Sequence, residues 1–166
     1  GTTGVELWMT DGTAAGTSRV ENIRPASGSS SPTYLTPLGN GKVVFSANDG
    51  STGIELWVTD GTAAGTSRVA DIFAASGNGN PQATTSLGNG KAIFRATDGS
   101  AGVELWVTDG TAAGTSRIAD INPGSAGSSP TGLTSLGNGK MVFRADDGST
   151  GAELWVTDGT AAGTFR

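Results

Sequence analysis

Apolar residues occur along the chain in short runs that are separated by glycine, asparagine and aspartate. In the segment VELWVT at positions 103–108, valine and leucine alternate with Glu104, Trp106 and Thr108. This two-residue period is that of a β-strand, whose successive side chains point to opposite faces of a sheet. No segment repeats apolar residues at three and four positions over the roughly ten residues that a helix needs. The pattern therefore predicts an all-β chain with almost no helix.

The apolar runs return at a fixed interval, because Trp8, Trp57, Trp106 and Trp155 are each separated by 49 residues. Within the repeat that contains Trp57, turn residues cut the sequence into four segments. These segments predict strands at Thr33–Leu38, Lys42–Ala47, Ile54–Thr59 and Ser67–Ile72. The Gly-Asn-Gly sequence at 39–41 predicts a tight type I′ hairpin between the first two strands, because Asn-Gly tolerates the positive φ angles of that turn.

This interval divides the chain into repeat units. Residues 1–30 form a partial repeat with strands three and four, and residues 31–79 and 80–128 form complete repeats. Residues 129–166 form a partial repeat with strands one to three and the start of strand four.

Each predicted unit carries large apolar groups on both faces of its third strand, so both faces need cover. Four-stranded antiparallel units with a 49-residue period are typical of β-propeller blades, which bury both faces against neighbouring blades. We therefore expect a β-propeller-type repeat with each tryptophan packed between adjacent units. A β-solenoid or another stacked β array is the alternative.

The third strand and its following turn also carry a family resemblance. The sequence ELWVTDGTAAGT, present in near-identical form in all four units, resembles the ELWxxDGTxxGT repeat of large bacterial proteins, most of them exported. The resemblance implies a β-propeller-like fold and a location outside the cell or on the bacterial surface. It brings no catalytic residues to this chain.

Charge and composition restrict the class of partner and of chemistry. The net charge is −5, and lysine and arginine are scattered singly, so we expect no nucleic-acid partner. No apolar run is long enough to span a bilayer, so we expect no membrane insertion. Histidine and cysteine are absent, which removes disulfides, the commonest general base and the commonest transition-metal ligands. Every acidic motif is copied from unit to unit, whereas an active site is made once, so the chain is predicted not to be an enzyme.

Acidic residues recur in two kinds of turn. The aspartate of each TDGT sequence, at positions 11, 60, 109 and 158, is expected to hold its own loop in an Asx-turn. The DGS loops offer hard oxygen ligands for calcium, and the alternative for the same letters is an Asp-Gly hairpin turn. The calcium candidates, the only cofactor considered, are Asp49, Glu55, Asp98, Glu104, Asp147 and Glu153.

Three further expectations concern side chains. The glutamate before each LW pair, at positions 6, 55 and 104, is expected to form a cross-strand ion pair with Arg19, Arg68 or Arg117. The connectors between units differ in charge, aromatics and proline, so the candidate ligand-binding residues are Arg24, Tyr34, Phe73, Asn78 and Gln82. The alternative for these positions is that the loops tolerate sequence variation that has no function. The tryptophans are expected to be core, with sugar stacking as the alternative.

The leading functional hypothesis is a non-enzymatic structural or interaction scaffold, a repeat segment of a larger bacterial surface protein. A carbohydrate-binding module is the alternative. The sequence covers a little over three units, fewer than the roughly four to eight blades of a closed propeller. We therefore expect the segment to associate with copies of itself, or with further repeats of a parent chain, in a closed ring or an open, filament-like stack.

Overall fold

The computed structural model describes residues 4–166, which form four antiparallel sheets and no helix. Accordingly, none of these residues belongs to a helix that could cross a membrane. The thirteen strands of this part of the chain are β1 (Trp8–Met9), β2 (Ser18–Arg19), β3 (Thr33–Pro37), β4 (Val43–Asn48), β5 (Ile54–Thr59), β6 (Ser67–Ala70), β7 (Gln82–Gly88), β8 (Lys91–Thr97), β9 (Val103–Thr108), β10 (Ser116–Ala119), β11 (Thr131–Ser135), β12 (Met141–Asp146) and β13 (Ala152–Thr157).

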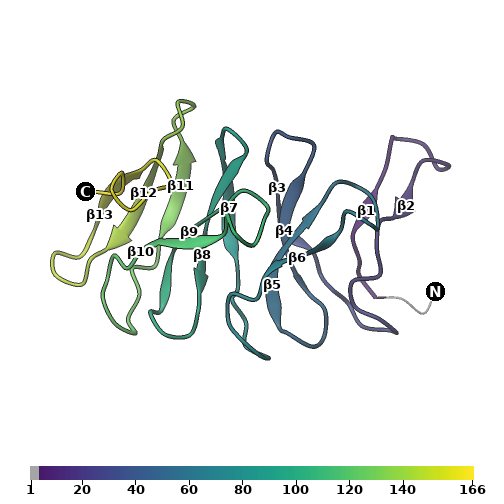
Figure 1. Cartoon of the computed structure of the whole chain (residues 1–166), viewed down its shortest axis with the longest axis horizontal. Coiled ribbons are helices and arrows are strands. Elements are labelled where there is room, and N and C mark those ends of the chain that lie inside the picture. Colours follow the sequence, from purple (N-terminus) through teal and green to yellow (C-terminus); the bar gives the residue numbers. More distant parts are fainter. Residues whose placement is uncertain (1–3) are drawn as a thin grey trace.

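Each sheet is a simple up-and-down meander, because its neighbours in space are also neighbours in sequence. The strand orders are β1-β2, β3-β4-β5-β6, β7-β8-β9-β10 and β11-β12-β13. Figure 1 shows these sheets side by side, with β1 and β2 at one end of the molecule and β13 at the other. The prediction of an all-β chain of four-stranded antiparallel units is confirmed for the two sheets that begin at β3 and β7.

The predicted strands of the β3–β6 sheet agree with the structure to within two residues, and Ile54–Thr59 agrees at both ends. The predicted type I′ turn at 39–41 is wrong. There only the two glycines have positive φ, and Leu38 N donates to Lys42 O across a three-residue loop. The type I′ signature, positive φ at both central residues, occurs instead at Asn89 and Gly90 in the next sheet.

The apolar core lies between sheets. The first junction joins Leu7, Val20 and Ile23 to Phe45, Ala47 and Trp57. In the second junction, residues of β4, β5 and β6 pack against Ala92, Phe94, Ala96 and Trp106. In the third junction, residues of β8, β9 and β10 pack against Met141, Phe143, Ala145 and Trp155. Trp57, Trp106 and Trp155 therefore pack between units, as predicted. Trp8 does not, since it is 59% exposed at the end of the molecule.

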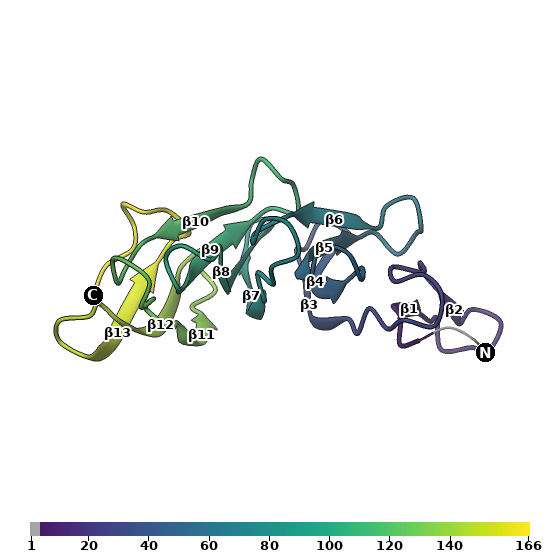
Figure 2. The ribbon, with the colours of Figure 1, turned by 90° about the horizontal axis from the view of Figure 1, so that it is seen from below.

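The sheets also contact one another along their first strands. Figure 2 shows β3, β7 and β11 on one side of the row and β6 and β10 on the opposite side. Thr36 Oγ1 donates to Thr84 O at 2.9 Å, which ties β3 to β7. Apolar packing between the sheets and contacts between their first strands therefore both hold the row of sheets together.

The first strand of each of these sheets contains a bulge. Register with the second strand shifts between Thr33 and Thr36, and shifts occur at equivalent places in β7 and β11. A left-handed residue lies at each bulge: Tyr34 (φ 55°), Ala83 (φ 53°) and Gly132 (φ 65°). Only glycine takes this conformation without a steric cost, so Tyr34 and Ala83 are strained.

Replacing Ala83 with glycine is expected to stabilise the protein by about 0.5–1 kcal/mol, because relief of the left-handed strain exceeds the added entropy of the unfolded chain. Chemical denaturation of both proteins measures the difference. The matched control is Ala119→Gly in β10, where φ is negative and the same change is expected to destabilise by about 1 kcal/mol. Equal effects at the two positions would contradict the assignment of strain.

Candidate functional site

A buried glutamate at the start of the third strand holds the connector that leads to the next unit. Glu55 Oε2 accepts from Ile72 N at 2.8 Å, and Glu55 Oε1 accepts from Gly79 N at 2.7 Å. Glu104 repeats the arrangement with Ile121 N (3.3 Å), Ser128 N (2.6 Å) and the Ser128 hydroxyl (2.5 Å). Each carboxylate thus joins both ends of one connector to the strand behind it.

Glu6 accepts equivalent hydrogen bonds from Ile23 N and from the amide and hydroxyl of Ser30. We call each of these three arrangements, at Glu6, Glu55 and Glu104, a glutamate socket. The side chains of Glu6, Glu55 and Glu104 are buried, whereas Glu153 is exposed. Burial raises the pKa of Glu55 and Glu104 above its ordinary value, although the connector amides act in the opposite direction. These carboxylates are held by backbone amides and, at Glu6 and Glu104, by a serine hydroxyl as well.

The predicted ion pairs between these glutamates and the arginines of strand four are therefore wrong. Arg68 lies 3.4 Å from Asp71, and Arg117 lies 3.4 Å from Asp98 in the β8–β9 loop. Arg166 lies 3.3 Å from Asp147 in the equivalent loop of the last sheet. The arginines and glutamates share a face, but the connector amides take the carboxylates because those amides would otherwise be buried without partners.

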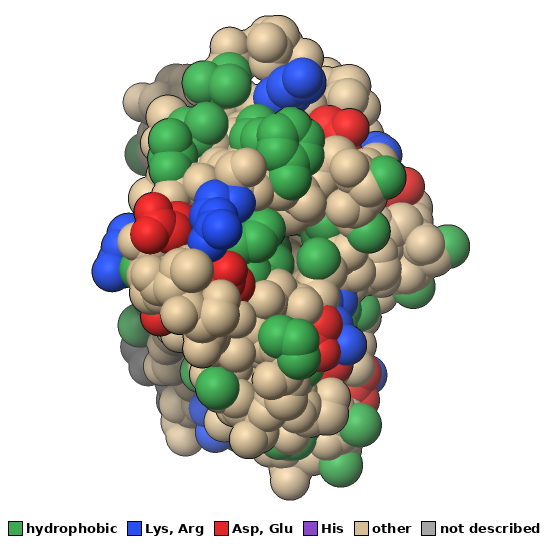
Figure 3. All heavy atoms as spheres, turned by 90° about the vertical axis from the view of Figure 1, so that its left-hand side faces the viewer, with side chains coloured by type: hydrophobic (Ala, Val, Ile, Leu, Met, Phe, Trp, Pro, Cys, Tyr) green, Lys and Arg blue, Asp and Glu red, His purple; other side chains and the backbone are tan. Residues whose placement is uncertain are grey.

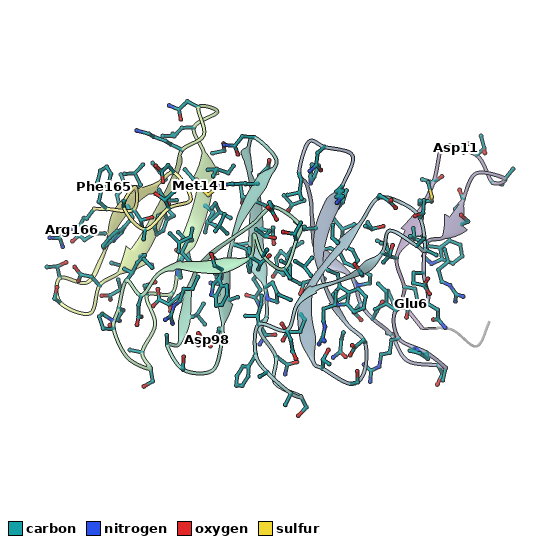
Figure 4. The ribbon with its side chains drawn as sticks, viewed as in Figure 1. Glu6, Asp11, Asp98, Met141, Phe165 and Arg166 are labelled. Atoms are coloured by element: carbon teal, nitrogen blue, oxygen red, sulfur yellow. The ribbon has the colours of Figure 1, made fainter. Side chains whose placement is uncertain are left out.

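The calcium candidates are engaged by different parts of the fold. Asp49 Oδ1 accepts from the amides of Ser51 and Thr52 within its own turn, while Glu55 faces the connector. Asp98 and Asp147 close their turns in the same way. Figure 4 shows Asp98 in a loop at the edge of its sheet and Glu6 near the N-terminal end of the row of sheets. Within residues 4–166, no cluster of three or more acidic residues is arranged to hold a metal ion.

The TDGT turns are Asx-turns, as predicted. Asp60 Oδ1 accepts from Thr62 N at 2.9 Å and from Thr62 Oγ1 at 2.7 Å, and the same bonds recur in the other three copies. Gly61 has φ +91°, as expected of a turn glycine. Gly65 does not have positive φ, and it is required for another reason: a Cβ there would lie 2.0 Å from Asp60 Oδ1.

The two kinds of carboxylate predict opposite pH dependences of stability. Burial acts to raise the pKa of Asp49, but the amides and hydroxyls of Thr52 and Ser51 prevail and lower it to about 2. Hydrogen bonds likewise lower the pKa of the TDGT aspartates. Their contribution is present above the ordinary aspartate pKa and is lost as pH falls through the folded value. The raised pKa values of Glu55 and Glu104 give a contribution that is complete below pH 4.5 and is lost as pH rises.

We therefore expect the free energy of unfolding to rise between about pH 2 and 4 and to decline above about pH 5. Urea unfolding across this range measures the profile. Asp49→Asn is expected to make the acid limb less steep, and Glu104→Gln is expected to make the decline at higher pH less steep, while the remaining aspartates and Glu55 keep part of each slope. A profile that rises steadily to pH 7 would contradict the assignment of the glutamates.

The candidate ligand residues of the connectors do not form one surface site. Gln82 Oε1 accepts from Arg95 Nη2 at 2.6 Å in a polar cavity of about 210 Å³ between the connector and β8. Arg24 lines the equivalent cavity one unit earlier. Asn78 Oδ1 accepts from Ile54 N, and the Phe73 ring packs beside Gly77 and Gly99, so both have structural contacts. Tyr34 is 47% exposed at its bulge.

The two ends of the molecule expose side chains whose equivalents are buried between sheets. At the C-terminal end, Leu154 is 69% exposed, whereas Leu56 and Leu105 are fully buried. Figure 3 views this end and shows hydrophobic side chains separated by charged ones. Figure 4 also places Phe165 and Arg166 at this end. Phe165 pairs with Val156 through two backbone hydrogen bonds, which begin a fourth strand beside β13.

At the opposite end, a groove of about 240 Å³ lies between β1–β2 and the neighbouring sheet. We call it the end groove. Apolar residues of both sheets line it, chiefly Leu7, Trp8, Met9, Val20, Leu35 and Val43, and Gly61 also lines it. Sequence reasoning did not identify this groove, because it arises from the contact between two units and not from a motif.

Comparison of the chain with protein-family models, with curated proteins and with solved structures returned no match.

Proposed function

We propose that this chain is a non-enzymatic scaffold segment that associates with further units of its own kind. The observation that carries the proposal is the difference between internal and terminal copies of one position. Leu56 and Leu105 are fully buried against the next sheet, and Leu154, with the same neighbours in sequence, is 69% exposed. Another sheet at this end would remove that apolar surface from water, which is the main driving force of protein association.

The same reasoning applies along the whole row. Each inner sheet presents one face with Leu and Val side chains and an opposite face with Phe, Ala and Trp. Such a contact joins two different surfaces, so it can continue indefinitely or close into a ring. We propose a β-propeller-like ring or an open stack as the assembled form.

The proposal also covers chemistry and location. All three buried glutamates described above are occupied in holding connectors, which supports a structural role and leaves them without a catalytic one. The resemblance to the ELWxxDGTxxGT repeats supports membership of a bacterial protein that acts outside the cell or on its surface.

A carbohydrate-binding module is the second candidate, and exposed Trp8 favours it. An aromatic face of this kind can stack on a sugar ring, and Trp8 is 59% exposed. A glycan array with the wild-type chain and Trp8→Ala tests this function. Binding that disappears in the variant would favour it over a purely structural role.

Light scattering on the chain over a concentration series tests the scaffold function. We expect the mass to increase with concentration to a multiple of the 16.4 kDa monomer. A folded monomer that melts cooperatively at every concentration would contradict the proposal.

A further inference from the structure

The polar cavity of about 210 Å³ lies where two successive connectors pass the sheet that begins at β7. Asn80 lies on the connector before β7, and Ser129 lies on the connector after β10. Arg95 and Thr97 of β8 also line the cavity, together with Gln82 of β7. None of the described residues that line it is acidic. The cavity therefore combines one cation with neutral polar groups from two connectors and two strands.

Hydrogen bonds fix both connectors at this cavity. The amides of Asn80 and Ser129 donate to carbonyl oxygens of β5 and β9 at 3.1 and 3.0 Å. The residue before each of them, Gly79 or Ser128, donates its own amide to a glutamate socket. The walls of the cavity are thus held in place without a ligand, so binding does not have to order them.

Arg95 brings a positive charge to this cavity and has only neutral partners there. Its Nη2 donates to Gln82 Oε1 at 2.6 Å, and its Nη1 donates to Pro130 O at 3.5 Å. In the described part of the chain Arg95 forms no ion pair, whereas three other arginines each pair with an aspartate. A guanidinium has five N–H donors in a planar fork, so donors of Arg95 remain for an anion.

The equivalent cavity one unit earlier also contains an arginine, but from another element. It has a volume of about 280 Å³ and is lined by Arg24 of the connector and by serine, threonine and asparagine side chains. Ser46 holds the position of Arg95 in that unit. An arginine among neutral polar groups therefore occurs in both cavities, although it comes from two different positions of the repeat.

The groups that line the Arg95 cavity favour a small hydroxylated carboxylate. One guanidinium matches the single charge of a carboxylate and can bind both of its oxygens, whereas a phosphate group carries about 1.5–2 negative charges at pH 7. The Gln82 amide and the hydroxyls of Thr97 and Ser129 are neutral groups that can bind ligand hydroxyls. The cavity is smaller than the roughly 300–1,000 Å³ of sites for drug-sized ligands, which favours a single sugar ring.

We propose that this cavity binds a sugar acid, with its carboxylate on Arg95 and its hydroxyls on Gln82, Thr97 and Ser129. This binding function goes beyond the scaffold function and does not depend on association between units. It is also separate from sugar stacking on Trp8, which lines the end groove.

Titration of the ¹⁵N-labelled chain with glucuronate, followed by NMR, tests the inference. We expect the amide signals of Asn80, Thr97 and Ser129 to shift together along one saturable curve. Arg95→Gln is expected to weaken binding about 10–100-fold, because charge-assisted hydrogen bonds are lost. Ser129→Ala, at an exposed residue, is expected to weaken it about 2–10-fold. The remaining amide signals show whether each variant is folded.

The matched control is Arg144→Gln, which removes an exposed arginine at the same position of the following unit and is expected to leave binding unchanged. Glucose lacks the carboxylate, acetate lacks the hydroxyls, and inorganic phosphate has the larger charge, so each is expected to bind more weakly than glucuronate. Acetate that binds as tightly as glucuronate would overturn the assignment of a sugar, and phosphate that binds more tightly would overturn that of a carboxylate. Absence of shifts at these amides, or an equal loss of binding in Arg144→Gln, would overturn the site.

Discussion

Replacing Glu104 with alanine is expected to lower the free energy of unfolding by about 3–5 kcal/mol, because three donors lose their only described acceptor in a buried site. These donors are the amides of Ile121 and Ser128 and the Ser128 hydroxyl. The connector that they belong to leads to the last sheet, so its release is also expected to loosen the third junction. Urea unfolding followed by tryptophan fluorescence measures the loss.

Glu153 provides a matched control, since it is the same residue in the same sequence motif but is exposed. Glu153→Ala is expected to change stability by less than about 0.5 kcal/mol. Glu104→Gln keeps one acceptor oxygen and is expected to fall between the two. If Glu104→Ala were as mild as Glu153→Ala, the socket would not stabilise the connector.

Replacing Phe94 with alanine is expected to cost about 3–5 kcal/mol, the usual range for removal of a fully buried ring. Phe94 is fully buried in the second junction, and its ring centre lies 6.4 Å from that of Trp106. The cavity would open between two sheets and not inside one, so the contact of neighbouring units is what the change weakens.

The control for this change is Phe165→Ala, because Phe165 is 54% exposed at the C-terminal end. That change is expected to cost less than about 0.5 kcal/mol. If the sheets on either side of Phe94 unfold at different urea concentrations in the Phe94→Ala variant, the second junction is what couples their unfolding. A mild effect of Phe94→Ala would show that the sheets do not depend on one another.

The strands and the TDGT turns were predictable because their signals are local. Alternation of apolar residues sets a strand, and an aspartate reaches amides two positions ahead, as Asp60 does with Thr62. The packing of Trp57, Trp106 and Trp155 between sheets followed from large side chains on both faces of the third strand.

The glutamate sockets were not predictable in the same way. The donors to Glu55 lie 17 and 24 residues further along the chain, on a connector whose path follows from the packing of two units. An arginine on the neighbouring strand was the simpler partner by charge, but buried amides without acceptors cost more than an exposed arginine does. One signal was available: the acidic residue recurs beside the tryptophan on the strand face that packs between units.

Association of the chain with further units of its own kind would cover the end groove, and the two methionines allow a direct test of this with copies of the chain. Met9 is 47% exposed in the end groove, whereas Met141 is fully buried in the third junction and serves as an internal control. Peptide mass spectrometry measures the rate of sulfoxide formation at each methionine in dilute peroxide. We predict that oxidation of Met9 slows as the protein concentration rises into the range where the chain assembles, while Met141 stays protected throughout. An oxidation rate at Met9 that is the same at every concentration would contradict association through this end of the molecule.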